Sequence, residues 1–183
     1  MLRADPSSAG HPPLLTLLAM VVAAESTGAA VWLLLADQRV LAGLAALVAL
    51  LVMVGVTPTV SAARGRFAER MLDRLFDACI LASVAWVWRA SDPAVSALAL
   101  IGLAASYLAA YERARGEALG YKGSEAVPYR AVRQGLLVAA LLTGWVRTML
   151  VIFAALTLFA AGVRASNVAA QERRRQIARW GMQ

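Results

Sequence analysis

The chain has 183 residues, of which 61% are hydrophobic and 16% are charged, and its formal net charge is +7. Soluble domains are about 45–50% apolar and about 25% charged, and a domain of this size cannot bury so large an apolar surplus in water. This composition excludes a soluble enzyme and, despite the positive charge, a nucleic-acid-binding module. The single cysteine, Cys79, and the single histidine, His11, exclude a disulfide scaffold and leave little for a cysteine- or histidine-based site.

Six apolar segments predict transmembrane helices, each of which needs about 20 predominantly apolar residues. In chain order the segments are 14–36, 40–56, 75–88, 93–111, 132–146 and 148–163. The third segment is short, but it continues backward through residues 66–74 without Gly or Pro, so we expect one long helix with charged first turns. Around these spans we expect three regions: an N-terminal tail (1–13), a transmembrane domain (14–164), and a basic segment (165–183) that either rests on lipid headgroups or is solvated.

Basic residues are distributed unevenly between the two sides of the predicted bundle. With six spans, 15 of the 18 basic residues fall on the side of the termini, whereas Arg39, Arg89 and Arg147 fall on the other side. Loops rich in Lys and Arg face the cytoplasm. The predicted fold class is therefore an all-α integral membrane protein, a six-transmembrane-helix bundle with cytoplasmic termini.

A stripe of acidic residues opens the third predicted helix. Glu69, Asp73 and Asp77 are four residues apart, which places their side chains on one face of a helix. Like charges at this spacing repel, and a magnesium ion held between carboxylates would relieve the repulsion. In the alternative interpretation, Arg70–Asp73 and Arg74–Asp77, each three residues apart, neutralise one another. Asp77 matters most because it lies one turn inside apolar sequence, where an unpaired carboxylate is costly.

Four arginines flank the predicted fourth loop: Arg113, Arg115, Arg130 and Arg133. Guanidinium groups bind phosphate oxygens bidentately, so this cluster suits a phosphate-bearing ligand. The alternative is that these arginines only set the topology and contact lipid headgroups.

Glu25 lies near the middle of the first span, beside Ser26 and Thr27. Ionisable residues at membrane depth often mark ion or substrate pathways. One hypothesis is therefore a small transporter that uses the Glu25 carboxyl. The other is a protonated or hydrogen-bonded packing residue.

The spans, the acidic stripe and the arginine-rich loop together resemble the CDP-alcohol phosphatidyltransferases, and most of all the actinobacterial phosphatidylinositol-phosphate synthases. The second half of the family signature, Gly-x-x-x-Asp-x-x-x-Asp, matches residues 69–77, with Glu69 in place of the glycine. Its Ala-Arg pair matches residues 63–64. Residues 111–118 are similar to the motif after the fourth span, and residues 130–133 to the motif that opens the fifth.

The first half of the signature is not retained. Val56, Thr59 and Val60 stand where the family has two aspartates and a glycine, and the spacer between Arg64 and Glu69 is shorter than in the family. The second helix therefore supplies no carboxylate to a two-metal centre. Two interpretations stay open: a transferase of this lineage, and a catalytically inactive relative that acts as a lipid-binding or partner subunit.

The resemblance implies transfer of a phosphatidyl group from a CDP-diacylglycerol-type lipid to a polyol or sugar-phosphate acceptor, with release of CMP, in phospholipid biosynthesis. It implies Mg²⁺ or Mn²⁺ held by Asp73 and Asp77, with Asp77 as the general base. Glu69, one turn before Asp73, is a further candidate metal ligand, and Glu112 or Glu117 are the candidates to replace the ligands that the signature has lost. The resemblance also implies a homodimer in a bacterial cytoplasmic membrane. The arginines that it implies for substrate binding are Arg64, Arg113, Arg115, Arg130 and Arg133.

Overall fold

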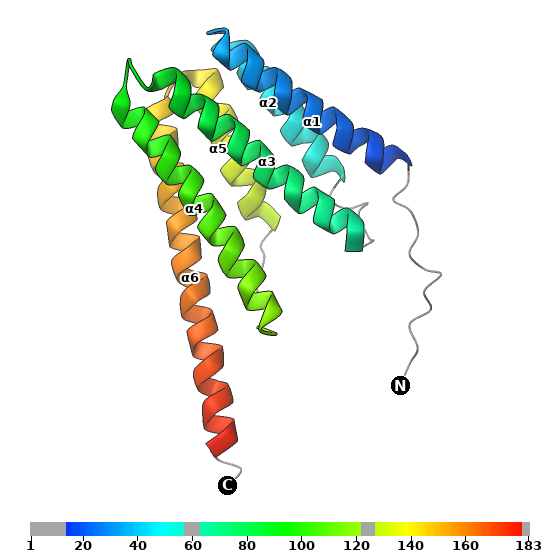
Figure 1. The fold of residues 1–183 in the computed structure, drawn as a ribbon, viewed down its shortest axis with the longest axis vertical. Coiled ribbons are helices and arrows are strands. Elements are labelled where there is room, and N and C mark those ends of the chain that lie inside the picture. Colours follow the sequence, from blue (N-terminus) through cyan, green and yellow to red (C-terminus); the bar gives the residue numbers. More distant parts are fainter. Residues whose placement is uncertain (1–13, 57–62, 122–126, 181–183) are drawn as a thin grey trace.

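The computed structural model describes the backbone of residues 14–56, 63–121 and 127–180, and their side chains except those of 56, 63–66, 127–130, 175 and 177–180. These ranges form six α-helices and contain no strand (Figure 1). The helices are α1 (Leu14–Leu35), α2 (Arg39–Val56), α3 (Ala63–Trp88), α4 (Pro93–Ala118), α5 (Val127–Thr143) and α6 (Val146–Trp180). The prediction of an all-α chain is confirmed, and α3 is the long helix with charged first turns that the sequence indicated.

Three of these helices are, by themselves, long and apolar enough to cross a membrane. They cover Leu14–Leu35, Pro93–Ala118 and Val146–Arg174. Shorter apolar segments lie in α2 (Arg39–Gly55) and α5 (Ala131–Thr143), and the charged turns of α3 lower its average hydropathy. The chain is therefore a membrane protein, but within the described ranges only three helices, not the expected six, meet the requirement individually.

The six helices pack as a closed ring. Around the ring, each helix contacts the next in the order α1, α2, α5, α6, α4, α3, and α3 contacts α1. Ala42, Ala46 and Ala49 are fully buried on the inner face of α2, where small side chains let neighbouring helices approach closely. Phe76 of α3 and Phe153 of α6 are the largest fully buried side chains of the core.

Three short turns join the helices in pairs at one end of the ring (Figure 1). Asp37, in the turn after α1, has a φ of 60°, a left-handed conformation that Asp tolerates better than most residues. Gly144, in the turn after α5, has a φ of 77°, which glycine adopts without strain. Before α4, Asp92 caps the helix by accepting a hydrogen bond from the Val95 amide, and Pro93 occupies the first helical position.

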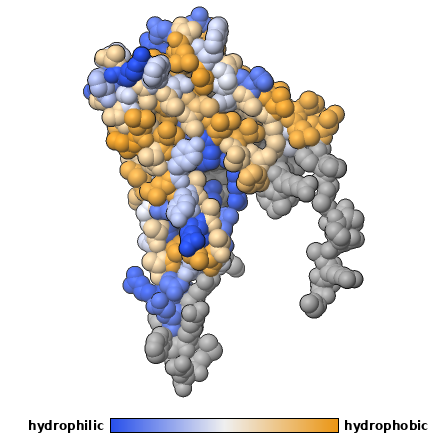
Figure 2. All heavy atoms as spheres, viewed as in Figure 1, coloured by the Kyte–Doolittle hydropathy of each residue, from blue (hydrophilic) through white to orange (hydrophobic). Residues whose placement is uncertain are grey.

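The surface has the pattern of a protein surrounded by lipid. Figure 2 shows hydrophobic residues spread over the bundle, with hydrophilic residues gathered near the short turns and toward the lower part of α6. Trp32, Trp86 and Trp145 are exposed close to the short turns. Exposed tryptophans at one level are typical of the interface between hydrocarbon and water.

α6 runs without a break through the expected boundary at residues 164/165. Its 35 residues correspond to about 52 Å, so the helix extends well beyond the bundle (Figure 1). Tyr121, after α4, donates a hydrogen bond to Glu172, and the Arg164 guanidinium donates to the Ala109 carbonyl at 3.4 Å. The helix continues because the sequence between Gly162 and Gly181 contains neither Gly nor Pro.

Candidate functional site

Asp73 and Asp77 lie side by side on the inner face of α3. Asp73 is 3% exposed and Asp77 is fully buried, so both carboxylates point into the helix ring and away from the surrounding lipid. Their spacing of four residues places them one turn apart on the same helix face, as the sequence predicted. The candidate site is built around this pair, where α3, α4 and α5 meet.

The Asp77 carboxylate is held by side chains from three helices. Arg133 of α5 donates from Nη2 to Oδ2 at 2.5 Å, and the Ser106 hydroxyl of α4 donates to the same oxygen at 2.8 Å. Arg74, one residue after Asp73 on α3, lies 3.4 Å from Oδ2 through Nη1. Both members of the Asp77–Arg133 pair are at most 3% exposed, so this is a buried, charge-assisted interaction.

Arg74 and Gln134 complete the polar network. Arg74 Nη1 donates to the Ser106 carbonyl at 3.1 Å and to its hydroxyl at 2.7 Å, which ties α3 to α4. The fully buried Gln134 of α5 donates from Nε2 to Asp73 Oδ1 at 3.4 Å. Asp73, Arg74, Asp77, Ser106, Arg133 and Gln134 are called the buried polar cluster below.

Guanidinium groups gather in and around the buried polar cluster. Asp73, Asp77, Arg133 and Arg113 all lie within electrostatic range of Arg74. Two of the three guanidinium groups, those of Arg74 and Arg133, lie within 3.4 Å of Asp77 Oδ2. In low-dielectric surroundings this positive charge opposes the approach of a cation.

Three buried atoms of the cluster have no hydrogen-bond partner within the described residues: Asp77 Oδ1, Arg133 Nε and Gln134 Oε1. Two of them are acceptors and one is a donor. Leaving such atoms unpaired costs about 1–3 kcal/mol each, and native proteins leave few of them. The cluster therefore has unused capacity to bind a polar group.

The side chains around Asp73 and Asp77 fit a magnesium ion poorly. Two guanidinium groups within 3.4 Å of Asp77 Oδ2 place positive charge where a divalent cation would approach. Within the described part of the chain, no group of three or more His, Cys, Asp or Glu side chains is arranged to hold a metal. The side chains of the buried polar cluster, as they are arranged, therefore do not fit a divalent metal ion.

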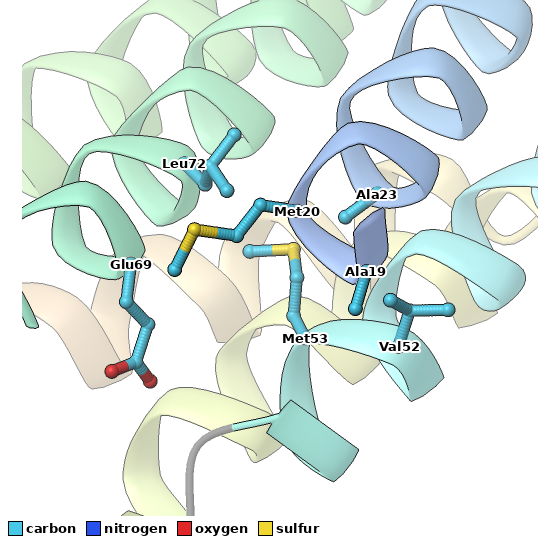
Figure 3. A pocket seen from close by; sticks show the side chains of 7 residues that line it. All are labelled: Ala19, Met20, Ala23, Val52, Met53, Glu69 and Leu72. Carbon is cyan, nitrogen blue, oxygen red and sulfur yellow. The ribbon is translucent and has the colours of Figure 1, made fainter. Parts of the chain in front are cut away.

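Glu69, the third acidic residue of the stripe, lies at a different place. It lines a small hollow between α1, α2 and α3, with an empty volume of about 240 Å³ that is partly open to the surroundings. Figure 3 shows Met20 and Met53 pointing toward each other across this hollow, and the Glu69 carboxylate directed away from them. Two steps of four residues rotate the helix face by about 80°, so Glu69 and Asp77 point to different neighbours. The other lining side chains are apolar.

The predicted substrate-binding arginines are only partly brought together. Arg133 belongs to the buried polar cluster and Arg113 lies near it, whereas Arg115 is exposed on α4. The side chains of Arg64 and Arg130 lie outside the described residues.

The two glutamates considered as substitute ligands differ in their surroundings. Glu117 accepts from Arg70 at 3.2 Å in an exposed pair between α4 and α3. Glu112 is half-buried, and its Oε2 is buried without a hydrogen-bond partner in the described part of the structure.

Glu25 lies on the outer face of α1. Its side chain is exposed, and it does not line the hollow between α1, α2 and α3. The transporter hypothesis requires Glu25 to face a water-filled cavity inside the protein, and this position gives it no support.

Ser106 and Gln134 are site residues that sequence reasoning missed. Ser106 is a lone hydroxyl in an apolar stretch, and Gln134 directly follows Arg133. A polar residue inside an otherwise apolar span was the available signal in both cases. Arg74 was noted only as a neutralising neighbour of Asp77.

Comparison with known proteins does not assign a function to the buried polar cluster. No known family model matches the chain, and no curated protein matches it. The functional conclusion therefore depends on the buried polar cluster and on the sequence motifs.

Proposed function

We propose that this chain is a membrane protein with the architecture of the CDP-alcohol phosphatidyltransferases that binds a phosphate-bearing ligand without transferring it. In this proposal all six helices cross a bacterial cytoplasmic membrane and both termini are cytoplasmic. The three short turns at one end of the ring and the charge bias of the loops support that topology. α2, α3 and α5 would cross because their polar groups face the ring interior.

The observation that carries the proposal is the engagement of Asp77 by Arg133. A general base must be free to accept a proton from an incoming hydroxyl. Oδ2 of Asp77 instead lies beside two guanidinium groups and accepts from Ser106. The carboxylate therefore acts as the counter-charge that allows Arg133 to be buried.

The guanidinium groups set the ligand class. Arg74 and Arg133 belong to the buried polar cluster and Arg113 lies near it, and guanidinium forks match phosphate oxygens. The ligand in this proposal is a CDP-diacylglycerol-type lipid or a polyol or sugar phosphate, entering from the cytoplasmic end where Arg113 lies. The protein would act as a lipid-binding or partner subunit in phospholipid metabolism.

The active transferase is the second candidate. It is favoured by Asp73 and Asp77 sharing the inner face of α3 and by Asp77 Oδ1, which has no hydrogen bond within the described residues. In that case Arg133 would have to move for Mg²⁺ or Mn²⁺ to bind between the carboxylates.

One experiment separates the two candidates. The purified chain in lipid nanodiscs is given CDP-diacylglycerol, magnesium and inositol phosphate or glycerol phosphate, and both ligand binding and CMP release are measured. We expect saturable binding without CMP release. CMP release that disappears in Asp77→Asn would establish the transferase, and absence of binding to every phosphate ligand would overturn the proposal.

Matched arginine variants locate the binding site. Arg113→Gln, at the edge of the buried polar cluster, should weaken binding about tenfold, the usual effect of losing one charge-assisted hydrogen bond. Arg70→Gln, whose exposed side chain pairs with Glu117, should leave binding unchanged. Equal effects of the two variants would indicate contact with headgroups only.

A further inference from the structure

The contact between Arg133 and Asp77 uses only part of each side chain. Arg133 Nη2 donates to Asp77 Oδ2 at 2.5 Å. Arg133 Nε and Asp77 Oδ1 are also buried, but neither has a hydrogen-bond partner within the described residues. A bidentate pair between a guanidinium group and a carboxylate forms two parallel hydrogen bonds, one to each carboxylate oxygen. The observed pair is therefore held by a single hydrogen bond, and Arg133 keeps a buried donor that an acceptor could still take.

Asp77 has other partners besides Arg133. The Ser106 hydroxyl donates to Asp77 Oδ2 at 2.8 Å, and Arg74 Nη1 lies 3.4 Å from the same oxygen. Ser106 in turn accepts from Arg74 at 2.7 Å, so these three side chains form a connected group without Arg133. An isolated buried carboxylate is the costly outcome when an ion pair is broken. Arg133 can therefore change its partner without leaving Asp77 in that state.

A phosphate group is able to take the place of the carboxylate beside Arg133. A phosphate monoester carries about −1.5 to −2 charges at pH 7 and three strong acceptor oxygens, which is more charge and one more oxygen than a carboxylate offers. Its oxygens match the guanidinium fork, and they would give Arg133 Nε the acceptor that it lacks. Arg133 would then be paired with an anion both before and after the exchange.

Given the proposed function, on which this inference rests, we propose that Asp77 is a built-in competitor of the ligand. The ligand phosphate displaces the Asp77 carboxylate from Arg133, and Asp77 stays with Ser106 and Arg74. Binding has to break the 2.5 Å contact, so Asp77 lowers the affinity of the site for its ligand. An anion that offers Arg133 no more charge than a carboxylate gains nothing from the exchange, so Asp77 keeps such anions out of the site.

Binding of glycerol phosphate to variants in lipid nanodiscs tests the exchange. Asp77→Asn should bind about 10- to 100-fold more tightly than the wild type, because the ligand no longer competes with a charge-assisted hydrogen bond. Adding Arg133→Gln to Asp77→Asn should abolish this gain, since the gain depends on a released Arg133. The matched control is Glu117→Gln, which neutralises a carboxylate in the exposed pair with Arg70 and should leave binding unchanged. An equal gain in Glu117→Gln, or a gain that survives Arg133→Gln, would show a general effect of charge and overturn the proposal.

Asp77→Asn removes the counter-charge of a buried arginine, so a measurement on the wild-type chain accompanies it. The nitrogen NMR signal of Arg133 Nε, assigned by its loss in Arg133→Lys, should shift when glycerol phosphate is added, because Nε gains an acceptor. Wild-type binding that leaves this signal in place, or that Asp77→Asn does not strengthen, would refute the exchange alone. Absence of glycerol phosphate binding to both the wild type and Asp77→Asn would refute the proposed function as well.

Discussion

Replacing Arg133 by leucine removes the closest cation to the Asp77 carboxylate, and the structure allows the cost to be estimated. The Arg133 and Asp77 side chains are 3% and 1% exposed, so solvent cannot replace the lost interaction. Removing one member of a buried ion pair costs about 3–5 kcal/mol. We therefore expect Arg133→Leu to lower the free energy of unfolding by about 3–4 kcal/mol, since Arg74 stays near Asp77.

The assay is unfolding in mixed micelles with increasing SDS, followed by tryptophan fluorescence. The double variant Asp77→Leu/Arg133→Leu should recover at least half of the loss, because no isolated carboxylate remains. The matched control is Arg70→Leu, in which the lost partner Glu117 is 44% exposed and the expected change is below about 1 kcal/mol. If Arg133→Leu and Arg70→Leu changed stability equally, the description of Asp77 as a buried counter-charge would be wrong.

Two further outcomes are expected from other parts of the structure. A Cβ at Gly102 would lie 3.1 Å from the buried ring of Phe153, so Gly102→Ala should lower the free energy of unfolding by about 1 kcal/mol. A Cβ at Gly135 would meet nothing within 4 Å. In the same assay Gly135→Ala should therefore raise the free energy of unfolding by about 0.5–1 kcal/mol, because alanine favours the helix more than glycine does. The hydrogen bond from Arg147 lowers the pKa of Asp92 below its usual value of 3.8, so the Asp92–Arg147 contact stabilises the folded protein at neutral pH and is lost as pH falls below about 4. The melting temperatures of wild type and Asp92→Asn should therefore differ at neutral pH and converge below about pH 4, and an equal difference at pH 7 and pH 3 would contradict the assignment.

The fold was largely predictable because hydropathy marks helix interiors. The expected starts of the first and fourth spans match Leu14 and Pro93, since composition changes sharply there and proline favours a first helical turn. α5 begins earlier than expected, at Val127, and α6 extends to Trp180. The extension of α6 is polar, so hydropathy did not register it, although most of its residues form helices readily. The extension of α5 contains Pro128 and Arg130, which interrupt the apolar run, and proline is tolerated because it lies in the first helical turn.

The site was predictable only where it depends on one helix. Spacing correctly placed Asp73 and Asp77 on one face, and the expected Arg74–Asp77 neutralisation is confirmed at 3.4 Å. Arg70 was expected to pair with Asp73, but it contacts Glu117 of α4. The contacts of Asp77 with Ser106 and Arg133 join residues 29 and 56 positions away, and such contacts follow from the order of helices in the ring, which a local pattern does not encode.

The short turns have a consequence for how the chain enters the membrane during synthesis. Each joins a helix that is long and apolar enough to cross a membrane to one that is shorter or carries charged turns: α1 to α2, α6 to α5, and α4 to α3. In the proposed six-span topology, the charged start of α3 would be costly to insert alone, whereas an antiparallel partner helix shields those charges from acyl chains. That topology would therefore favour insertion as three successive helical hairpins.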